Sequence, residues 1–183
     1  MRKHNMLRQI ILETERTYLR NLTEKDAENF FNLNLDKEVL KFTGDSSFQT
    51  IDEAIKFLEL YDQYEKYGVG RLAVINKNSN KFIGWCGLKY SPDLNEYDIG
   101  FRFLKDVWNQ GYASETARKC LEFGFVELKV DEIVGRAITQ NIASVKVLEK
   151  IGMTFKNNFD FDGKEGVVYQ MTKNAYEKGK PNR

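Results

Sequence analysis

The sequence predicts a mixed α/β fold, of the α+β kind, in which helices pack against one sheet. The chain has 183 residues, which is the length of about one domain. Its middle part alternates apolar and polar residues with a period of two, and segments of helical period lie on both sides of it. No repeat and no Pro/Gly/Ser-rich linker divides the chain. We therefore expect one domain over residues 1–183, with its core at about 13–172.

The N-terminal third predicts one strand and two helices. Residues 18–20 suit a short strand, and Thr23 followed by Asp26 is similar to the capping box of a helix start. A glycine-containing loop over 41–49 comes next. A second helix is expected to begin within 50–52 and to end before the next glycines. Its apolar face would comprise Ile51, Ile55, Leu58 and Tyr61.

The rest of the chain predicts three antiparallel strands and then alternating helices and strands. The expected strands are 71–75, 81–90, 97–104, 131–138, 153–159 and 166–171, and the expected helices are 112–128 and 141–151. Turn-forming residues separate the strands, as at 76–80. The order is strand, two helices, three strands, helix, strand, helix and two strands, which indicates a mixed sheet covered by helices.

Composition excludes several classes of protein. Lys and Arg number 28 and Asp and Glu 27, so a net charge of +1 gives no field that would hold nucleic acid or a membrane surface. The one histidine, His4, lies in an N-terminal stretch that we expect to fray, so neither a histidine-based triad nor a histidine-rich metal site is expected. No segment approaches the ~20 apolar residues of a membrane span, and the apolar stretch 7–12 is too short for a signal peptide.

The two cysteines also limit the possibilities. Cys86 and Cys120 lie far apart and form no CxxC pair, so they make neither a zinc ribbon nor a disulfide framework. Both lie in apolar surroundings, which favours buried, reduced thiols and a cytoplasmic location. We expect no bound metal.

The first segment that points to chemistry is Asp106–Glu115, where a strand ends, a short loop contains Gly111 and a long helix begins. The loop and the first helical turn present backbone N–H groups without intrahelical partners, which suits a pyrophosphate. Gly111 lets the backbone approach the phosphates, and Ala113 keeps the helix start uncrowded. Taken alone, the same residues also fit an ordinary loop before a helix.

The second segment is Asn141–Met153. Asn141 is suited to cap a helix, Ser144 lies one turn further on the same face, and Gly152 follows the end of the helix. A capped amphipathic helix explains most of this pattern when it is taken alone.

Together the two segments resemble the GNAT superfamily of acyl-CoA-dependent N-acetyltransferases. Trp108, Gly111 and Ala113 are similar to its acyl-CoA signature, Gln/Arg-x-x-Gly-x-Gly/Ala. Trp at the first position departs from the commonest form and resembles the Rim-type branch, which acetylates protein N-termini, including those of ribosomal proteins. The strings ETERTYLRNLTEKDAENF, FIGWCGL, DIGFRFLKDVWNQGYASETA and NIASVKVLEKIGM also resemble that branch. The resemblance covers about Glu13 to Met171.

The resemblance implies the GNAT fold, with a mixed, mostly antiparallel sheet splayed between its fourth and fifth strands (97–104 and 131–138) and helices on both faces. It places acetyl-CoA in the splay. The pyrophosphate would lie on N–H groups of the glycine loop, Asn141 would bond the pantetheine chain, and a backbone N–H near Phe101 would receive the thioester carbonyl. The residues implied to bind acetyl-CoA are Phe101, Phe103, Asn109, Gln110, Gly111, Tyr112, Ala113, Ser114 and Asn141.

The implied reaction is direct attack of an amine on a thioester, which needs no covalent enzyme intermediate, metal or histidine. The amine must be neutral, and an α-amine with a pKa of ~7.7–8.0 is easier to deprotonate than a lysine-like amine at ~10.4. Asp98 is the first candidate for the general base because it borders the splay, although a solvated strand carboxylate explains it too. The other candidates are Glu96, Asp160, Asp162 and Glu165.

Ser144 is the candidate for the group that meets the leaving thiolate, and it could instead only orient the sulfur. Many family members use a tyrosine seven residues after the asparagine of this helix. That position here is Leu148, so a tyrosine acid from this helix is absent.

The amine acceptor would be a protein N-terminus or a small amine such as a polyamine or an antibiotic. Phe42, Asp45 and Phe48, together with Tyr64, are the candidates for reading a cationic acceptor, but core packing explains a Phe-rich sequence equally well. No direct nucleic-acid or membrane partner is expected, and a homodimer is left open. The main alternative function is a non-catalytic module that senses acyl-CoA. A nucleic-acid-associated protein is a third, which the net charge disfavours.

Overall fold

The computed structural model describes residue 9 and residues 11–179, and one eight-stranded sheet runs through it in the order β1-β2-β3-β4-β5-β6-β8-β7. His4 and the last four residues lie outside the described part. The strands are β1 (Ile11–Glu13), β2 (Thr17–Asn21), β3 (Arg71–Asn76), β4 (Phe82–Ser91), β5 (Glu96–Phe103), β6 (Glu132–Ile138), β7 (Thr154–Phe161) and β8 (Lys164–Thr172). The predicted mixed sheet is thereby confirmed.

Seven α-helices accompany the sheet in the described part of the chain. They are α1 (Ala27–Leu33), α2 (Lys37–Leu40), α3 (Ile51–Glu59), α4 (Gln63–Tyr67), α5 (Tyr112–Glu122), α6 (Ile142–Lys150) and α7 (Lys173–Lys178). A 3-10 turn (Glu24–Asp26), in which Thr23 and Asp26 form the expected capping box, precedes α1, and a π-helical turn (Phe123–Glu127) continues α5.

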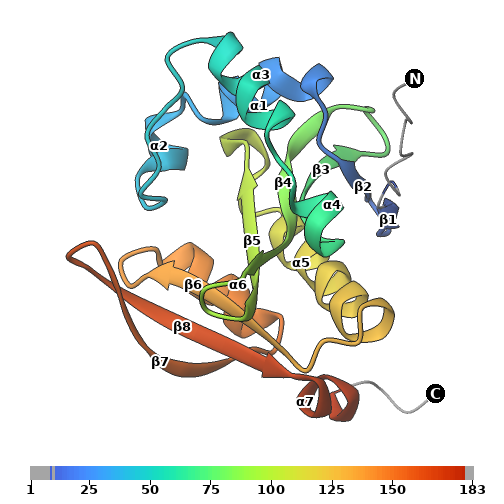
Figure 1. The fold of residues 1–183 in the computed structure, drawn as a ribbon, viewed down its shortest axis with the longest axis vertical. Helices are drawn as coiled ribbons and strands as arrows, with labels where there is room; N and C mark the ends of the chain where they lie inside the picture. The colour runs from blue at the N-terminus through green and yellow to red at the C-terminus, as the bar shows by residue number, and fades with distance from the viewer. Residues whose placement is uncertain (1–8, 10, 180–183) are drawn as a thin grey trace.

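The sheet consists of two antiparallel parts joined by one parallel pairing. Strands β1 to β5 form a meander, and β6, β8 and β7 form the second part. The parallel strands β5 and β6 pair only at Tyr97 with Ile133 and at Asp98 with Val134. Figure 1 shows β5 and β6 running apart from there, with β6, β8 and β7 crossing at an angle to the first part.

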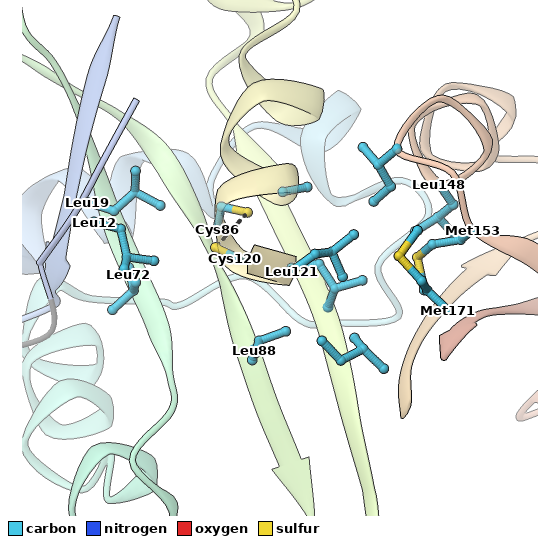
Figure 2. Packing of buried hydrophobic residues seen from close by; sticks show 14 of the residues in the cluster. Leu12, Leu19, Leu72, Cys86, Leu88, Cys120, Leu121, Leu148, Met153 and Met171 are labelled. Atoms are coloured by element: carbon cyan, nitrogen blue, oxygen red, sulfur yellow. Dashed lines mark hydrogen bonds between the residues drawn. The ribbon is translucent and has the colours of Figure 1, made fainter. Parts of the chain in front are cut away.

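Alternate residues of each strand point to opposite faces of the sheet, and helices cover an apolar core on each face. On β3, Leu72 and Val74 belong to the core that also holds residues of α5 and α6, whereas Ala73 and Ile75 belong to the core under α1 and α3. We call these the α5 face and the α1 face. Cys86 on β4 and Cys120 on α5 meet in the α5-face core, as Figure 2 shows, with their sulfur atoms 3.8 Å apart.

The structure corrects several element predictions. Strand β1 and helices α2, α4 and α7 were not predicted, because three to six residues carry too little periodicity. The second predicted helix ends at Glu59, and Ile51 at its start is exposed; Ala54 and Leu58 are its buried residues. The packed part also extends beyond 13–172, since Leu12 is buried.

Candidate active site

The candidate site is built where β5 and β6 separate. Asp98 and Val134 are the last paired residues, so the following residues of both strands lack each other as hydrogen-bonding partners. Because the two strands are parallel, their carboxyl ends lie at the same end of the sheet, and each is followed by a helix, α5 or α6. Two helix N-termini and an opened pair of strands therefore share one region.

The loop before α5 has the backbone geometry of an anion site. Gly111 precedes the helix with φ +84°, and Asn109 also adopts a positive φ of 60°. No side chain caps α5, so the N–H groups of Tyr112, Ala113 and Ser114 are left for another acceptor. A Cβ on Gly111 would have only the Arg16 side chain within 4 Å, at 3.5 Å. The open space and the free N–H groups fit the pyrophosphate of an acyl-CoA.

Trp108 and Arg16 hold this loop in place. Trp108 Nε1 donates to the carbonyl of Phe103 at 2.8 Å, which ties the loop to the end of β5. Arg16, in the turn between β1 and β2, donates from Nε to Glu115 at 2.7 Å and from Nη1 to the carbonyl of Gln110 at 2.9 Å. Its guanidinium also lies over the Tyr112 ring, 4.2 Å from the centroid. Arg16 is far from the loop in sequence, so no local pattern could have indicated this contact.

Asn141 and Ser144 lie at the start of α6. Asn141 Oδ1 accepts from the N–H of Ser144 at 3.2 Å and so caps the helix as expected. The capping bond occupies the oxygen and leaves the Nδ2 donors of Asn141 for other partners. Both side chains are half-buried.

Apolar residues line the separated strands on the α5 face. Phe103 is buried there, and Phe101 is half-buried against the same core. Leu148 fills the space above Gly135, where a Cβ would come within 2.6 Å of it. The position where many relatives carry tyrosine is thus part of the packed wall.

Asp98 and Glu96 lie on the α1 face of β5 and share one cation. Arg136 on β6 donates from Nη1 to Asp98 Oδ2 and from Nη2 to Glu96 Oε2. Burial raises the pKa of Asp98 to about 6, and the nearby Arg136 opposes that rise. Asp98 is therefore ionised at neutral pH and more basic than an ordinary aspartate. We did not predict a role for Arg136 from the sequence, although a charged residue inside an otherwise apolar strand can indicate a functional site.

The predicted acceptor residues have structural partners. Asp45 pairs with Arg102 of β5 at 2.5 Å, and the Phe48 ring lies 5.8 Å from each of the Phe30 and Phe57 rings. The ammonium of Lys41 lies 5.3 Å from the half-buried ring of Phe42.

Tyr64 has a structural role that the sequence did not suggest. Its hydroxyl donates to the carbonyl of Arg71 and accepts from the N–H of Leu22, so it joins two backbone segments. Burial raises its pKa. These bonds favour the packing explanation of Tyr64, and a contact with the acceptor stays a prediction.

The remaining candidate bases lie on the hairpin of β7 and β8. Asp160 and Glu165, with Phe159, line a hollow of ≈ 540 Å³, and Asp160 Oδ1 accepts from the N–H of Gly163 in the turn. Asp162 forms the turn itself with a positive φ of 49°. Within the described residues no cluster of three or more His, Cys, Asp or Glu suits a metal ion, and no described helix has the length and apolarity to cross a membrane.

Comparison with known proteins agrees with this geometry. The family model described as "Acetyltransferase (GNAT) domain" matches residues 16–154. The uncharacterized N-acetyltransferase YoaA of Bacillus subtilis is 30% identical over 174 residues, which cover 93% of this chain and 91% of that protein. A GNAT-family acetyltransferase structure from Bacillus anthracis superimposes with a TM-score of 0.78 at 26% identity, over 90% of this chain and 99% of the other.

The chain belongs to the GNAT acetyltransferase family. It is an N-acetyltransferase of the class that takes its acetyl group from acetyl-CoA. The same fold is found in spermidine N-acetyltransferase from Vibrio cholerae, solved with CoA and spermine, with a TM-score of 0.74 at 18% identity over 88% of this chain and 98% of that one. This last match concerns the fold alone.

Proposed function

We propose that the protein transfers the acetyl group of acetyl-CoA directly to a primary amine, either a protein N-terminal α-amine or a small amine. The observation that carries the proposal is the two-residue pairing of β5 with β6, next to the uncapped start of α5. Acetyl-CoA, when bound, supplies the thioester. The residues proposed to hold it are Phe101, Phe103, the loop Asn109–Ser114 and Asn141.

Asp98 is the proposed general base. It lies at the last paired position before the strands separate, and only its Oδ2 is engaged by Arg136 among the hydrogen bonds of the described residues. Oδ1 is thus left to accept a proton from the amine, directly or through water. A pKa of about 6 keeps the base ionised at neutral pH and raises its basicity above that of a free aspartate.

Ser144 is proposed to orient the leaving sulfur. Its hydroxyl is half-buried in the first turn of α6, one turn from Asn141. A thiolate of ordinary pKa needs little proton donation, so an orienting hydroxyl is sufficient. The Rim-type specificity for protein N-termini is supported by the motif around Trp108, and an α-amine suits a single carboxylate base because it loses its proton near neutral pH.

The experiment that tests the function is acceptor-dependent release of CoA. Peptides with free N-termini, polyamines and aminoglycosides are incubated with acetyl-CoA, and the thiol released is measured while acetyl-CoA binding is followed by calorimetry. Release with one class of amine is the expected result and identifies the acceptor. Tight acetyl-CoA binding without release from any amine would contradict transfer and would favour a sensor.

A further inference from the structure

The carboxylates on the α1 face near the splay already have cationic partners. Four carboxylates face this side: Asp45, Glu96, Asp98 and Glu132. Asp45 pairs with Arg102 at 2.5 Å, and Glu132 pairs with Lys156 at 2.5 Å. Glu96 and Asp98 share Arg136. Beyond the reacting amine, a second ammonium group of a polyamine would have to compete with one of these cations.

Arg71, in contrast, has no acidic partner among the described residues. It is the first residue of β3 and half-buried, with its guanidinium 4.8 Å from the Trp85 ring and 5.5 Å from the Phe57 ring. No salt bridge or side-chain hydrogen bond of this guanidinium occurs within the described part, yet its nitrogens are not among the buried unpartnered atoms. Solvent therefore reaches them. An accessible guanidinium stacked on aromatic rings is well suited to bind an anion.

Trp85 adds an unused donor beside Arg71. The residue is 6% exposed, and its Nε1 is buried with no hydrogen-bond partner in the described structure. A buried N–H without an acceptor costs free energy, which an entering acceptor atom would recover. The ring also lies over Gly100, where a Cβ would come within 3.1 Å of it, so Trp85 is next to the strand that carries Asp98.

Arg102 makes this region more positive still. Its guanidinium lies 5.5 Å from the same Trp85 ring, on the strand that carries Asp98. Burial lowers the pKa of Arg102, Asp45 opposes that change, and Arg71 adds to it by repulsion. Two guanidinium groups thus contact one indole ring while a single carboxylate, Asp45, neutralises them.

We propose that Arg71 and Trp85 form a subsite for an anionic group of the acceptor, so that the substrate class is a primary amine that also carries a carboxylate. This inference rests on the proposed function and names its substrate class. Arg71 lies opposite Gly87 on β4, and Gly87 lies opposite Gly100, two residues from Asp98. Two strand spacings and an offset of two residues along the strand separate the two backbone positions by about 12 Å, so the carboxylate belongs on the order of 10–12 Å from the amine. A peptide N-terminus with an acidic side chain within its first three or four residues has this spacing, and so does an ω-amino acid.

The test compares acceptors that differ only in charge. Three hexapeptides with free N-termini carry Glu, Gln or Lys at position three, and 7-aminoheptanoate is compared with its amide and with spermidine. We expect a KM about tenfold or more lower for the Glu peptide than for the Lys peptide. A preference for 7-aminoheptanoate without a peptide preference would assign the anion to a small molecule. A preference for spermidine or for the Lys peptide would overturn the subsite, and would direct attention to the carboxylates of the β7–β8 hairpin.

Variants locate the effect. Arg71→Gln is expected to remove most of the preference for Glu over Gln, with the larger fall in kcat/KM for the Glu peptide. Arg71→Lys is expected to retain part of the preference. Lys81→Gln, at an exposed position before β4, is the charge-matched control. An equal fall in kcat/KM for all three peptides in Arg71→Gln would show that Arg71 has a structural role, and it would overturn the proposal.

Binding separates this inference from the proposed function. Calorimetry with the Glu peptide in the presence of CoA measures the subsite without turnover. Arg71-dependent binding without CoA release from any acceptor would support the subsite and contradict acetyl transfer. Neither binding nor release would overturn both.

Discussion

Arg136 on β6 donates a hydrogen bond to Asp98 on β5, and this contact joins the two strands at the point where their backbones separate. The pair therefore combines a structural task with a chemical one. It holds the open strands together on the α1 face, and it moderates the rise in the pKa of Asp98 that burial causes.

Replacing Asp98 is expected to remove the acid limb of the pH profile. The pKa of Asp98 is about 6, so the carboxylate is protonated below that pH and cannot accept a proton; kcat should fall as the pH decreases through about 6. Asp98→Asn should lower kcat by about a hundredfold and abolish this limb. Asp93→Asn, in the exposed turn before β5, is the control. A wild-type limb in Asp98→Asn would assign the base to Glu96 or to the hairpin carboxylates.

Gly111→Val is expected to raise the KM for acetyl-CoA by about tenfold or more, because the side chain would enter the open space beside the free N–H groups. Its positive φ also strains any β-branched residue, which costs about 1–3 kcal/mol of folding stability. Gly68→Val introduces the same strain at φ +66°, outside the loop before α5 and with no atom within 4 Å of its Cβ. Equal KM values in the two variants would argue against the pyrophosphate assignment.

Two substitutions of Asn141 separate capping from binding. Asn141→Asp keeps an oxygen that accepts from the Ser144 N–H but loses the Nδ2 donors, whereas Asn141→Ala loses both. We expect both to raise the KM for acetyl-CoA, and only Asn141→Ala to lower the free energy of unfolding, by about 1 kcal/mol. Urea denaturation and steady-state kinetics measure the two effects. An unchanged KM in Asn141→Asp would restrict the residue to capping.

Arg16→Gln is expected to loosen the phosphate loop without affecting the acceptor. It removes the bond to the Gln110 carbonyl and the pair with Glu115, so the KM for acetyl-CoA should rise several-fold while kcat stays the same. Lys77→Gln breaks a more exposed pair, with Glu13 at 3.2 Å, and serves as the control. A parallel rise in the acceptor KM would indicate general distortion instead.

The two thiols should be unreactive in the folded protein. The contact with Cys86 and complete burial both raise the pKa of Cys120, so little thiolate is available. A disulfide-type thiol reagent should therefore react slowly with the native protein. After denaturation in urea, the same reagent should label both cysteines readily. Fast labelling of the native protein would contradict the packing in Figure 2. The expected result also means that released CoA can be measured with the same reagent against a low background.

Much of the fold was predictable because the signals were local. The two-residue alternation on β5, the helix start after Gly111 and the cap at Asn141 each lie within a few neighbouring residues. The candidate site was harder, because its partners come from distant segments. Arg16 meets Glu115 across 99 positions, and Arg136 meets Asp98 across 38. No periodicity encodes which charged residues pair, and none indicated that the Tyr64 hydroxyl joins two backbone segments.

The separation of β5 from β6 also bears on self-association. Exposed strand edges invite the strands of other molecules, and sheet proteins discourage this with short edge strands, lysines and bulges. The outer edges here are the three-residue β1 and β7, which carries Lys156 and an irregular register between Phe155 and Asn157. The separation of β5 from β6 creates two further strand edges, but these face each other inside the sheet and not at its border. The unpaired backbone between β5 and β6 can thus accept an extended ligand such as the proposed acetyl-CoA, but a strand of a neighbouring copy would have to enter the sheet to reach it. The opening therefore adds little risk of aggregation.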